Sequence, residues 1–497
     1  MKNKPKEPPR IAVKFANMVF VLGILYSVLL IVYAIYKIYN PPGPVSPAFY
    51  IISILSCGVF ATLFGFGLKR LNNNLKVNLS VLFFTIGIAV YGFEIYLESR
   101  YDTRTKMEVL DDLRDSGVEA YPNIVPGYLI NSNGLTTKKG RIYPLGTISN
   151  STTILGNESG YYPIIETDEH GFNNPKGLYN KNKVDIILTG DSFAEGYTVH
   201  QNESIGAVLR QLDFNAISIG KGGNGSLIEL ATLKEYAEPL KPKIVLWVYF
   251  VNDLNDLEVE MQSSILKKYL NEDDYSQNLI SRQEEIDAVL INYVQVEWEK
   301  EKNKEKERVE NNTNWTTNTN EVIINKIINN RIIRILKLNK LRRMINLRPT
   351  PTPTPAPTPI FVDILQKSKQ MVSDWDGKMY FVYLPEFARY SIGNEDPNRD
   401  FVLRTATELD IPIIDIHKEV FDPHPDPLSL FPFRIGHHYT AEGYKLVVEA
   451  IGKRLEADGY VPIKSRKQGN SYRKVADQIT KSTRKTFPVE YLAKAGR

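Results

Sequence analysis

The sequence is poor in cysteine. Its 497 residues include one, Cys57, which lies inside an apolar run. A single cysteine allows no intramolecular disulfide and no cysteine-based metal site, so a secreted disulfide-stapled scaffold is excluded. The glycine-rich stretch "GKGGNGS" lacks the lysine followed by serine or threonine that a phosphate-binding loop requires. We therefore expect no cofactor and no bound metal, and we expect no nucleic-acid partner for a chain whose net charge is only +4.

Charged residues are missing from two long runs near the N-terminus. Residues 15–36 and 47–68 carry none, and a third apolar run, 77–93, is followed by Glu94. Crossing a bilayer takes roughly 20 apolar residues, so the first two runs are long enough and the third is marginal. A cleaved signal peptide has one short apolar core instead of three. The sequence predicts a transmembrane region over 1–106, with spans at about 15–36, 47–68 and 77–97; buried core helices are the alternative.

Lysine and arginine flank these runs unevenly. Five precede the first run, the first loop holds only Lys37, and the second loop holds Lys69, Arg70 and Lys76. Cytoplasmic loops carry the excess of positive charge, so we expect a multi-pass membrane protein with its N-terminus inside and its larger domain extracytoplasmic. The basic residues Arg100, Arg104 and Lys106 count against this orientation.

Beyond the apolar region, the pattern changes twice. Residues 107–180 form a prelude of short apolar pieces, glycine and proline, which predicts short strands and turns without a long helix. From about 184, apolar strands alternate with amphipathic helices. The strands are expected at 184–190, 215–220, 243–250, 378–384 and 411–416, and the helices at 203–212, 226–240, 397–409 and 440–455. This alternation predicts an α/β domain over 181–460, with a parallel sheet covered by helices on both faces.

An insertion at 257–360 interrupts the alternation. It begins with charged helical sequence (282–310), passes a polar patch, "NNTNWTTNTN", and ends in a stiff Pro/Thr linker at 348–359. Between them, apolar residues at helical spacing over 322–345 alternate with lysines and arginines that have no acidic neighbours in the sequence. This basic amphipathic helix could lie on a membrane surface or beside an anionic polymer, or it could pack on its own domain. The tail, 461–497, is also basic.

Three of the predicted strands end in residues that can carry chemistry. Ser192 follows the first strand, a glycine turn containing Gly223 follows the second, and Asn252 follows the third. The carboxyl ends of parallel strands share one edge, where ligands bind. Acyl transfer needs a hydroxyl, a base and preformed oxyanion donors, and the base could come from His437 or His438 ahead of the last helix. Alone, Ser192 could be only a helix cap, and the two histidines could bind metal with His424, although no ligand spacing supports this.

The order of these residues resembles the SGNH hydrolases, also called GDSL esterases and lipases. The blocks are "GDSF", "NAISIGKGGNG", "YFVND" and "GHHYTAEG", and the prelude segment "DEHGFNN" resembles membrane-bound bacterial members that handle polysaccharides. The resemblance implies a three-layer, flavodoxin-like parallel sheet. It further implies Ser192 as nucleophile, His438 (five residues before Gly443) as base, and Gly223 and Asn252 as oxyanion donors.

The chain departs from the family pattern at one catalytic position. The family usually has Asp three residues before the histidine, and here that residue is Ile435. Asp415, Asp422 and Asp426 are candidate replacements, and a backbone carbonyl could orient the imidazole instead.

The resemblance implies a membrane-anchored serine esterase or O-acyltransferase that acts on an ester, in particular an acylated cell-surface glycan. A membrane protein that supplies the acyl group would be its partner. The alternatives are a non-catalytic glycan-binding or assembly component with a degenerate site, which Ile435 favours, and a lipase or lysophospholipase.

Overall fold

The computed structural model describes residues 7–40, 47–180, 184–310, 331–345, 347 and 359–460, without the side chains of 301–310, 331 and 333. These residues form two compact units, which are described separately. The first takes in Met1–Asp102 and Glu301–Pro355, and the second takes in Thr103–Lys300 and Ala356–Arg497.

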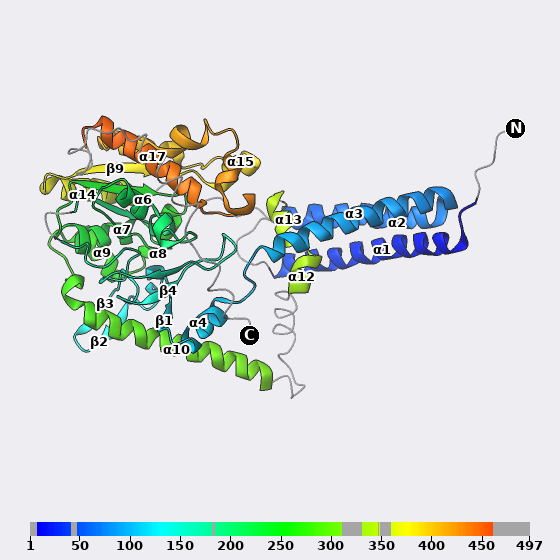
Figure 1. The fold of residues 1–497 in the computed structure, drawn as a ribbon, viewed down its shortest axis with the longest axis horizontal. Coiled ribbons are helices and arrows are strands. Elements are labelled where there is room, and N and C mark those ends of the chain that lie inside the picture. The colour runs from blue at the N-terminus through cyan, green and yellow to red at the C-terminus, as the bar shows by residue number, and fades with distance from the viewer. Residues whose placement is uncertain are drawn as a thin grey trace. The chain divides into compact units, whose positions relative to one another are not determined.

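The first unit is built on three long helices, α1 (Arg10–Tyr39), α2 (Ala48–Arg70) and α3 (Asn73–Ser99), which run alongside one another (Figure 1). All three are long and apolar enough to cross a membrane. Their large apolar side chains point outward, with Leu29 66% and Ile52 62% exposed. The helix α3 begins four residues before the predicted span because Asn72 caps it, accepting a hydrogen bond from the Leu75 backbone N–H at 2.9 Å.

The basic segment of the insertion packs in this first unit. It forms two short helices, α12 (Arg331–Leu336) and α13 (Asn339–Met344), and both contact α3. The predicted continuous helix is wrong at Leu338, whose φ of +50° interrupts the helical path. The segment has no acidic neighbours in the sequence, but in the folded unit Arg334 pairs with the buried Glu98 of α3 at 2.8 Å. This pair could not be predicted from local sequence, because the two residues are 236 positions apart.

A five-stranded parallel sheet forms the centre of the second unit. Its strands are β6 (Ile186–Gly190), β7 (Ala216–Ser218), β8 (Ile244–Tyr249), β9 (Lys378–Tyr383) and β10 (Ile413–Asp415). Their order across the sheet is β10-β9-β8-β6-β7, and every pair is parallel. Numbered along the chain, this is the 2-1-3-4-5 order of flavodoxin-like sheets. All five predicted strands and the α/β class are confirmed.

Helices cover the sheet on both faces. They are α5 (Ser192–Glu195), α6 (Ile205–Gln211), α7 (Ser226–Thr232) with a π-helical continuation (Leu233–Ala237), α14 (Pro359–Asp374), α15 (Phe387–Ile392), α16 (Arg399–Glu408) and α17 (Ala441–Ala457). Successive strand residues face opposite sides, so Ile186 and Leu188 pack with α6 and α17 in one core, and Ile187 packs with α7 in the other. The predicted three layers are therefore confirmed.

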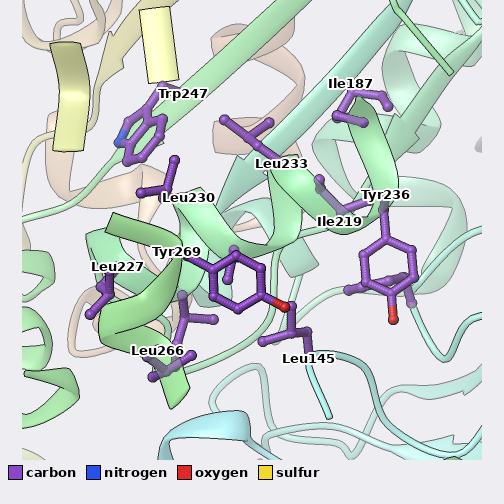
Figure 2. Close-up of a cluster of buried hydrophobic side chains, with 14 of the residues drawn as sticks. Leu145, Ile187, Ile219, Leu227, Leu230, Leu233, Tyr236, Trp247, Leu266 and Tyr269 are labelled. Atoms are coloured by element: carbon purple, nitrogen blue, oxygen red, sulfur yellow. The ribbon is translucent and has the colours of Figure 1, made fainter. Parts of the chain in front are cut away.

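Figure 2 shows the core on the α7 side of the sheet. Leu227, Leu230 and Leu233 project from one stripe of α7 and its continuation, and Trp247 from β8 lies against this stripe. All four side chains are fully buried. Complete burial of an apolar side chain of this size stabilises the fold by about 1.5–3 kcal/mol, so this stripe fixes α7 on the sheet.

The prelude contains five short strands, β1 (Ala120–Pro122), β2 (Leu135–Thr137), β3 (Gly140–Ile142), β4 (Thr152–Ile154) and β5 (Ile164–Glu166). It also contains a helix that the sequence reading missed, α4 (Lys106–Asp115). A capping box begins this helix: the Thr105 side chain accepts from the Glu108 N–H, and the Glu108 carboxylate accepts from the Thr105 N–H. Threonine followed three residues later by glutamate is a readable signal for such a helix.

The segment "DEHGFNN" joins the prelude to the sheet. Asp168 is fully buried and accepts hydrogen bonds from the backbone of His170 and Phe172, at 2.9 Å each. Asn174 donates to both Asp168 and the Ser218 carbonyl of β7, at 2.8 Å each. The polar residues Asp168 and Asn174 therefore have a structural role, since they hold the segment together and bond it to β7.

The insertion contributes α8 (Asp253–Glu260), α9 (Ser264–Asn271) and α10 (Gln283–Glu310). The last is the charged helix that the sequence predicts. The polar patch 311–320, nearly all of the Pro/Thr linker 348–359, and the basic tail 461–497 lie outside the described residues.

Candidate active site

The site lies where the strand order of the sheet reverses. The chain leaves β6 toward β7 on one side, and it returns to β8 on the other side of β6. Such a switch point opens a crevice at the carboxyl ends of the two central strands. Ser192 follows β6, and Asn252 follows β8. The topology therefore puts the predicted nucleophile and one predicted oxyanion donor at the same crevice.

A tight turn places Ser192 at the end of β6. Gly190 has a φ of +149°, and a Cβ there would lie 2.8 Å from the Val248 carbonyl oxygen, so only glycine fits. Asp191 caps α5, accepting a hydrogen bond from the Phe193 N–H at 2.8 Å. Ser192 is thus the first helical residue and not the cap. The reading of Ser192 as a helix cap is wrong because the neighbouring Asp191 fills that role.

His438 is held by the residues that follow it. Thr440 caps α17 through the Gly443 N–H at 3.2 Å, which fixes where the helix starts. The Tyr439 hydroxyl donates to the Pro385 carbonyl at 2.6 Å, and its ring is fully buried. These two anchors leave little freedom for the backbone of His438. Its ring centroid lies 4.8 Å from that of Phe193.

The structure brings Ser192 and His438 into direct contact. The His438 Nε2 atom lies 2.7 Å from the Ser192 Oγ atom. This is hydrogen-bond reach for proton transfer from a hydroxyl to an imidazole. Two residues 246 positions apart in the sequence therefore meet in the geometry that a serine nucleophile and its base require.

A carboxylate stands behind His438, and it comes from the prelude. The Oε1 atom of Glu158 lies 3.2 Å from His438 Nδ1, an ion-pair distance, although the ring N–H is not aligned for a full hydrogen bond. The other oxygen, Oε2, accepts the backbone N–H groups of His437 and His438 at 2.8 and 3.1 Å. Catalytic hydrogen bonds are often loose before substrate binds. Serine, histidine and glutamate thus stand in triad order.

Two of the three aspartates proposed from the sequence pair with arginines, and the third follows a π-helical turn. Asp426 pairs with Arg434, and Asp415 pairs with Arg399. Asp422 stands at the end of the π-helical turn His417–Phe421, where its N–H bonds the His417 carbonyl at 2.8 Å. Ile435, at the usual aspartate position, is 1% exposed and packs as an apolar residue.

Glu158 could not be found by spacing because it precedes the nucleophile and belongs to another substructure. Its loop is fixed to the residues after α5. The Gly156 N–H donates to the Tyr197 carbonyl at 3.0 Å, and the Ser159 hydroxyl donates to the Thr198 carbonyl at 2.8 Å. A side chain at position 156 would collide with the Tyr197 ring, since a Cβ would lie 2.1 Å from it.

The pair of Glu158 and His438 shifts the pKa values of both groups. Burial alone would lower the pKa of His438, but the close negative charge of Glu158, with those of Asp191 and Glu195, outweighs it, and the pKa is raised from its ordinary value. Burial likewise opposes the ionised Glu158, yet His438 and the two backbone N–H groups hold its pKa well below the usual range. Glu158 therefore stays ionised and favours the imidazolium that forms when His438 accepts a proton.

The two predicted oxyanion donors lie in the loops after β7 and β8. Gly223 has a φ of +71°, and a Cβ there would lie 2.9 Å from the Val125 side chain. Its neighbour Gly222 is closer to the nucleophile, since a Cβ at 222 would lie 3.7 Å from that of Ser192. The Asn252 amide donates to Asp256 at 2.6 Å, which orients it. The role of Gly223 and Asn252 as oxyanion donors stays a prediction.

A buried ion pair holds the glycine turn beside Ser192. Lys221 is 1% exposed and pairs with Glu195 of α5, which is fully buried. Lys221 also donates to Asn123 of the prelude at 2.5 Å, and Glu195 accepts the Gly222 N–H at 2.8 Å. One charged pair thus links the nucleophile helix, the glycine turn and the prelude.

We expect Lys221→Met to destabilise the second unit by about 3–5 kcal/mol, because it leaves the Glu195 carboxylate buried without a counter-charge. Urea denaturation of the full chain in detergent, followed by tryptophan fluorescence, measures the loss. The matched control is Lys221→Met with Glu195→Gln, which removes both charges and should recover most of the stability. A loss below about 1 kcal/mol in the single variant would contradict this role for the pair.

Comparisons with known proteins find only distant structural likenesses. No family model matches the chain, and no curated protein matches it. The chain is similar to the solved structure of TesA at 9% identity, with a TM-score of 0.29, over 55% of this chain and 98% of that one.

Two further solved structures are similar at the same level. A lipase/acylhydrolase from Enterococcus faecalis is 11% identical, with a TM-score of 0.29, over 55% of this chain and 96% of that one. The α/β hydrolase LAE5 from the Lake Arreo metagenome is 13% identical, with a TM-score of 0.29, over 57% and 99%. At these values the likeness bears on neither substrate nor activity. The chain's own strand order is that of an α/β domain, and the places of Ser192 after β6, Asn252 after β8 and His438 before α17 agree with what the resemblance to the SGNH hydrolases implies.

Proposed function

We propose that the chain is a membrane-anchored serine esterase or O-acyltransferase that works through an acyl-enzyme on Ser192. The observation that carries the proposal is the 2.7 Å contact between Ser192 Oγ and His438 Nε2, with Glu158 3.2 Å behind the imidazole. A serine that is only structural has no need of a histidine and a carboxylate in line behind it.

The proposed reaction has two halves. Ser192 Oγ attacks the ester carbonyl while its proton passes to His438 Nε2. The tetrahedral intermediate collapses, the alcohol leaves with the proton from His438, and an acyl-Ser192 ester remains. An acceptor hydroxyl then gives its proton to His438 and attacks the acyl-enzyme carbonyl. When the second intermediate collapses, His438 returns this proton to Ser192 Oγ and the new ester or acid leaves. Water as acceptor gives an esterase, and a glycan hydroxyl gives an O-acyltransferase.

The oxyanion of each intermediate needs donors that are in place before the reaction. We assign this role to the backbone N–H groups of Ser192 and Gly223 and to the Asn252 amide. Support comes from Gly223, whose φ of +71° favours glycine in this turn, and from Asp256, which accepts a hydrogen bond from the Asn252 amide at 2.6 Å and so orients it.

The proposed substrate is an acylated cell-surface glycan. The membrane helices would hold the α/β domain at the cell envelope, extracytoplasmic by the charge of the flanking loops, and a membrane protein would deliver the acyl group. The non-catalytic alternative was based on Ile435, which replaces the usual aspartate. The Glu158 carboxylate beside His438 can take the place of that aspartate, so this argument no longer favours a non-catalytic role.

We expect Ser192-dependent ester turnover that responds to a glycan acceptor. Purified full chain in detergent is given p-nitrophenyl acetate with and without a de-acetylated bacterial polysaccharide, and mass spectrometry detects acetyl esters on the glycan. A transferase should form acetyl esters on the de-acetylated polysaccharide. In a second reaction the enzyme is given the O-acetylated polysaccharide, from which an esterase should release acetate.

A lysophospholipid serves as the third substrate in this assay. Preference for it over both glycan reactions would replace the glycan proposal with a lysophospholipase. Absence of turnover on all three substrates, with folded protein, would contradict catalysis.

A further inference from the structure

The basic segment of the insertion is seated on the third membrane helix by two buried carboxylates. Glu94 is fully buried, and its two oxygens accept the backbone N–H groups of Lys340 and Leu341 at 2.8 and 2.7 Å. It therefore stabilises the start of α13, which has no side-chain cap of its own. One turn further along α3, Glu98 accepts two bonds from the Arg334 guanidinium, at 3.0 and 2.8 Å.

The break between α12 and α13 is also bonded to the membrane helices. The Leu336 carbonyl accepts hydrogen bonds from the hydroxyls of Tyr26 on α1 and Tyr91 on α3, at 3.1 and 3.3 Å. Irregular backbone near hydrocarbon requires such internal partners. The segment 331–345 is thus fixed at the end of the bundle where α1 and α3 finish.

This segment exposes several large apolar side chains. Its large apolar residues are Ile332, Leu336, Ile345 and, just beyond it, Leu347, which are 65%, 47%, 63% and 52% exposed. Exposed apolar side chains beside three membrane-length helices fit contact with acyl chains at the bilayer interface.

Three cations converge beside these apolar side chains. The Lys37 and Lys337 ammonium groups approach the same ring, that of Tyr33, at 6.0 and 4.4 Å from its centroid. The Arg342 guanidinium lies 5.7 Å from the Phe49 ring. Within the described ranges, no carboxylate forms an ion pair with Lys37, Lys337 or Arg342. Glu94 and Glu98 face α13 and Arg334 instead.

The cluster is short of negative charge. The pKa of Lys337 is lowered by burial and then by the like charges of Lys37 and Arg342, with no acidic group acting against them. Half-buried cations that repel one another need a counter-ion, and among the described carboxylates of this unit Glu94 and Glu98 are bonded to α13 and Arg334 instead.

We propose that Lys37, Lys337 and Arg342 bind the phosphate of an anionic phospholipid, whose acyl chains lie along the exposed apolar residues of 332–347. A phosphate offers acceptor oxygens to both ammonium and guanidinium groups. A soluble phosphate would satisfy the same cations, but it would leave the apolar side chains in water. The apolar residues therefore favour the lipid as the source of the phosphate.

Native mass spectrometry of the full chain in detergent tests the site. Short-chain phosphatidylglycerol, short-chain phosphatidylcholine and inorganic phosphate are titrated separately. The variants are Lys337→Gln with Arg342→Gln, and separately Lys37→Gln, which leaves the insertion unchanged. The matched control is Lys69→Gln, an exposed lysine at the opposite end of α2.

We expect wild type to bind phosphatidylglycerol at least tenfold more tightly than phosphatidylcholine. Each cation near an anionic head group contributes about fivefold in affinity, so the double variant should lose about 25-fold and Lys37→Gln about fivefold. Lys69→Gln should match wild type. Equal affinity for the two lipids in wild type would overturn the site, and so would preference retained in both variants. Phosphate that binds as tightly as phosphatidylglycerol would overturn the lipid assignment.

Discussion

Ser192→Ala is expected to abolish both turnover and covalent labelling by a fluorophosphonate probe. Without Oγ there is no acyl-enzyme, and removal of a serine nucleophile from a working triad lowers kcat by about 10⁶-fold. Labelling requires the same activated oxygen, which His438 Nε2 approaches to 2.7 Å. Gel fluorescence after incubation of the purified full chain with the probe measures it directly.

The matched control for this prediction is Ser226→Ala. Ser226 begins α7 near the same sheet edge and is fully buried, and its hydroxyl has no hydrogen-bond partner among the described residues. It should label and turn over like wild type. Labelling that persists in Ser192→Ala would sink the assignment of the nucleophile, whereas loss in both variants would point to unfolding, which circular dichroism reveals.

Glu158→Gln is expected to lower kcat by about 10³–10⁴-fold while leaving the fold intact. The change keeps the size of the side chain and removes the charge that stabilises the His438 imidazolium. Loss of the orienting carboxylate in a triad costs on the order of 10⁴ in rate. Steady-state kinetics with a p-nitrophenyl ester measures the effect.

The pH profile separates this role from a packing role. His438 must be neutral to accept the Ser192 proton, so the acid limb of kcat/KM reports its pKa in the free enzyme. Glu158 raises that pKa. Removal of the carboxylate should therefore move the acid limb to lower pH, although the maximum rate falls.

Asp426→Asn is the control for Glu158→Gln, because Asp426 pairs with Arg434 at an exposed position. It should leave both rate and pH profile unchanged. If Asp426→Asn reduced the rate as much as Glu158→Gln, or if the acid limb stayed in place in Glu158→Gln, Glu158 would not be the orienting group.

Much of the fold was predictable because its signals are local. A buried parallel strand such as Ile186–Gly190 is a continuous apolar run, and an uncharged run over 15–36 has few soluble counterparts. The contact between Ser192 and His438 was predictable because each residue sits in a short motif, whereas the oxyanion roles of Gly223 and Asn252 stay predictions. The helix α4 was predictable in principle, since Thr105 and Glu108 carry its capping box.

The remaining features depend on tertiary contacts between distant residues. Nothing in "GNESGYY" marks Glu158 as different from other surface glutamates, because its role depends on a backbone contact 280 residues away. The same holds for Glu94, whose partners on α13 lie 246 and 247 positions further along. Periodicity describes a residue's own element and says nothing of what another element brings to it.

The proposed triad takes its carboxylate, Glu158, from the prelude, and this limits where the chain can be divided. A chain that starts at residue 181 would contain the four blocks with Ser192, Gly223, Asn252 and His438, and would lack Glu158. It would also lack Asn123, which bonds the Lys221 that adjoins the glycine turn. Exchange of α/β domains between proteins of this architecture at that boundary would therefore transfer a serine and a histidine without the group that orients them. The smallest portion of the chain that carries all the groups of the proposed reaction therefore includes the prelude.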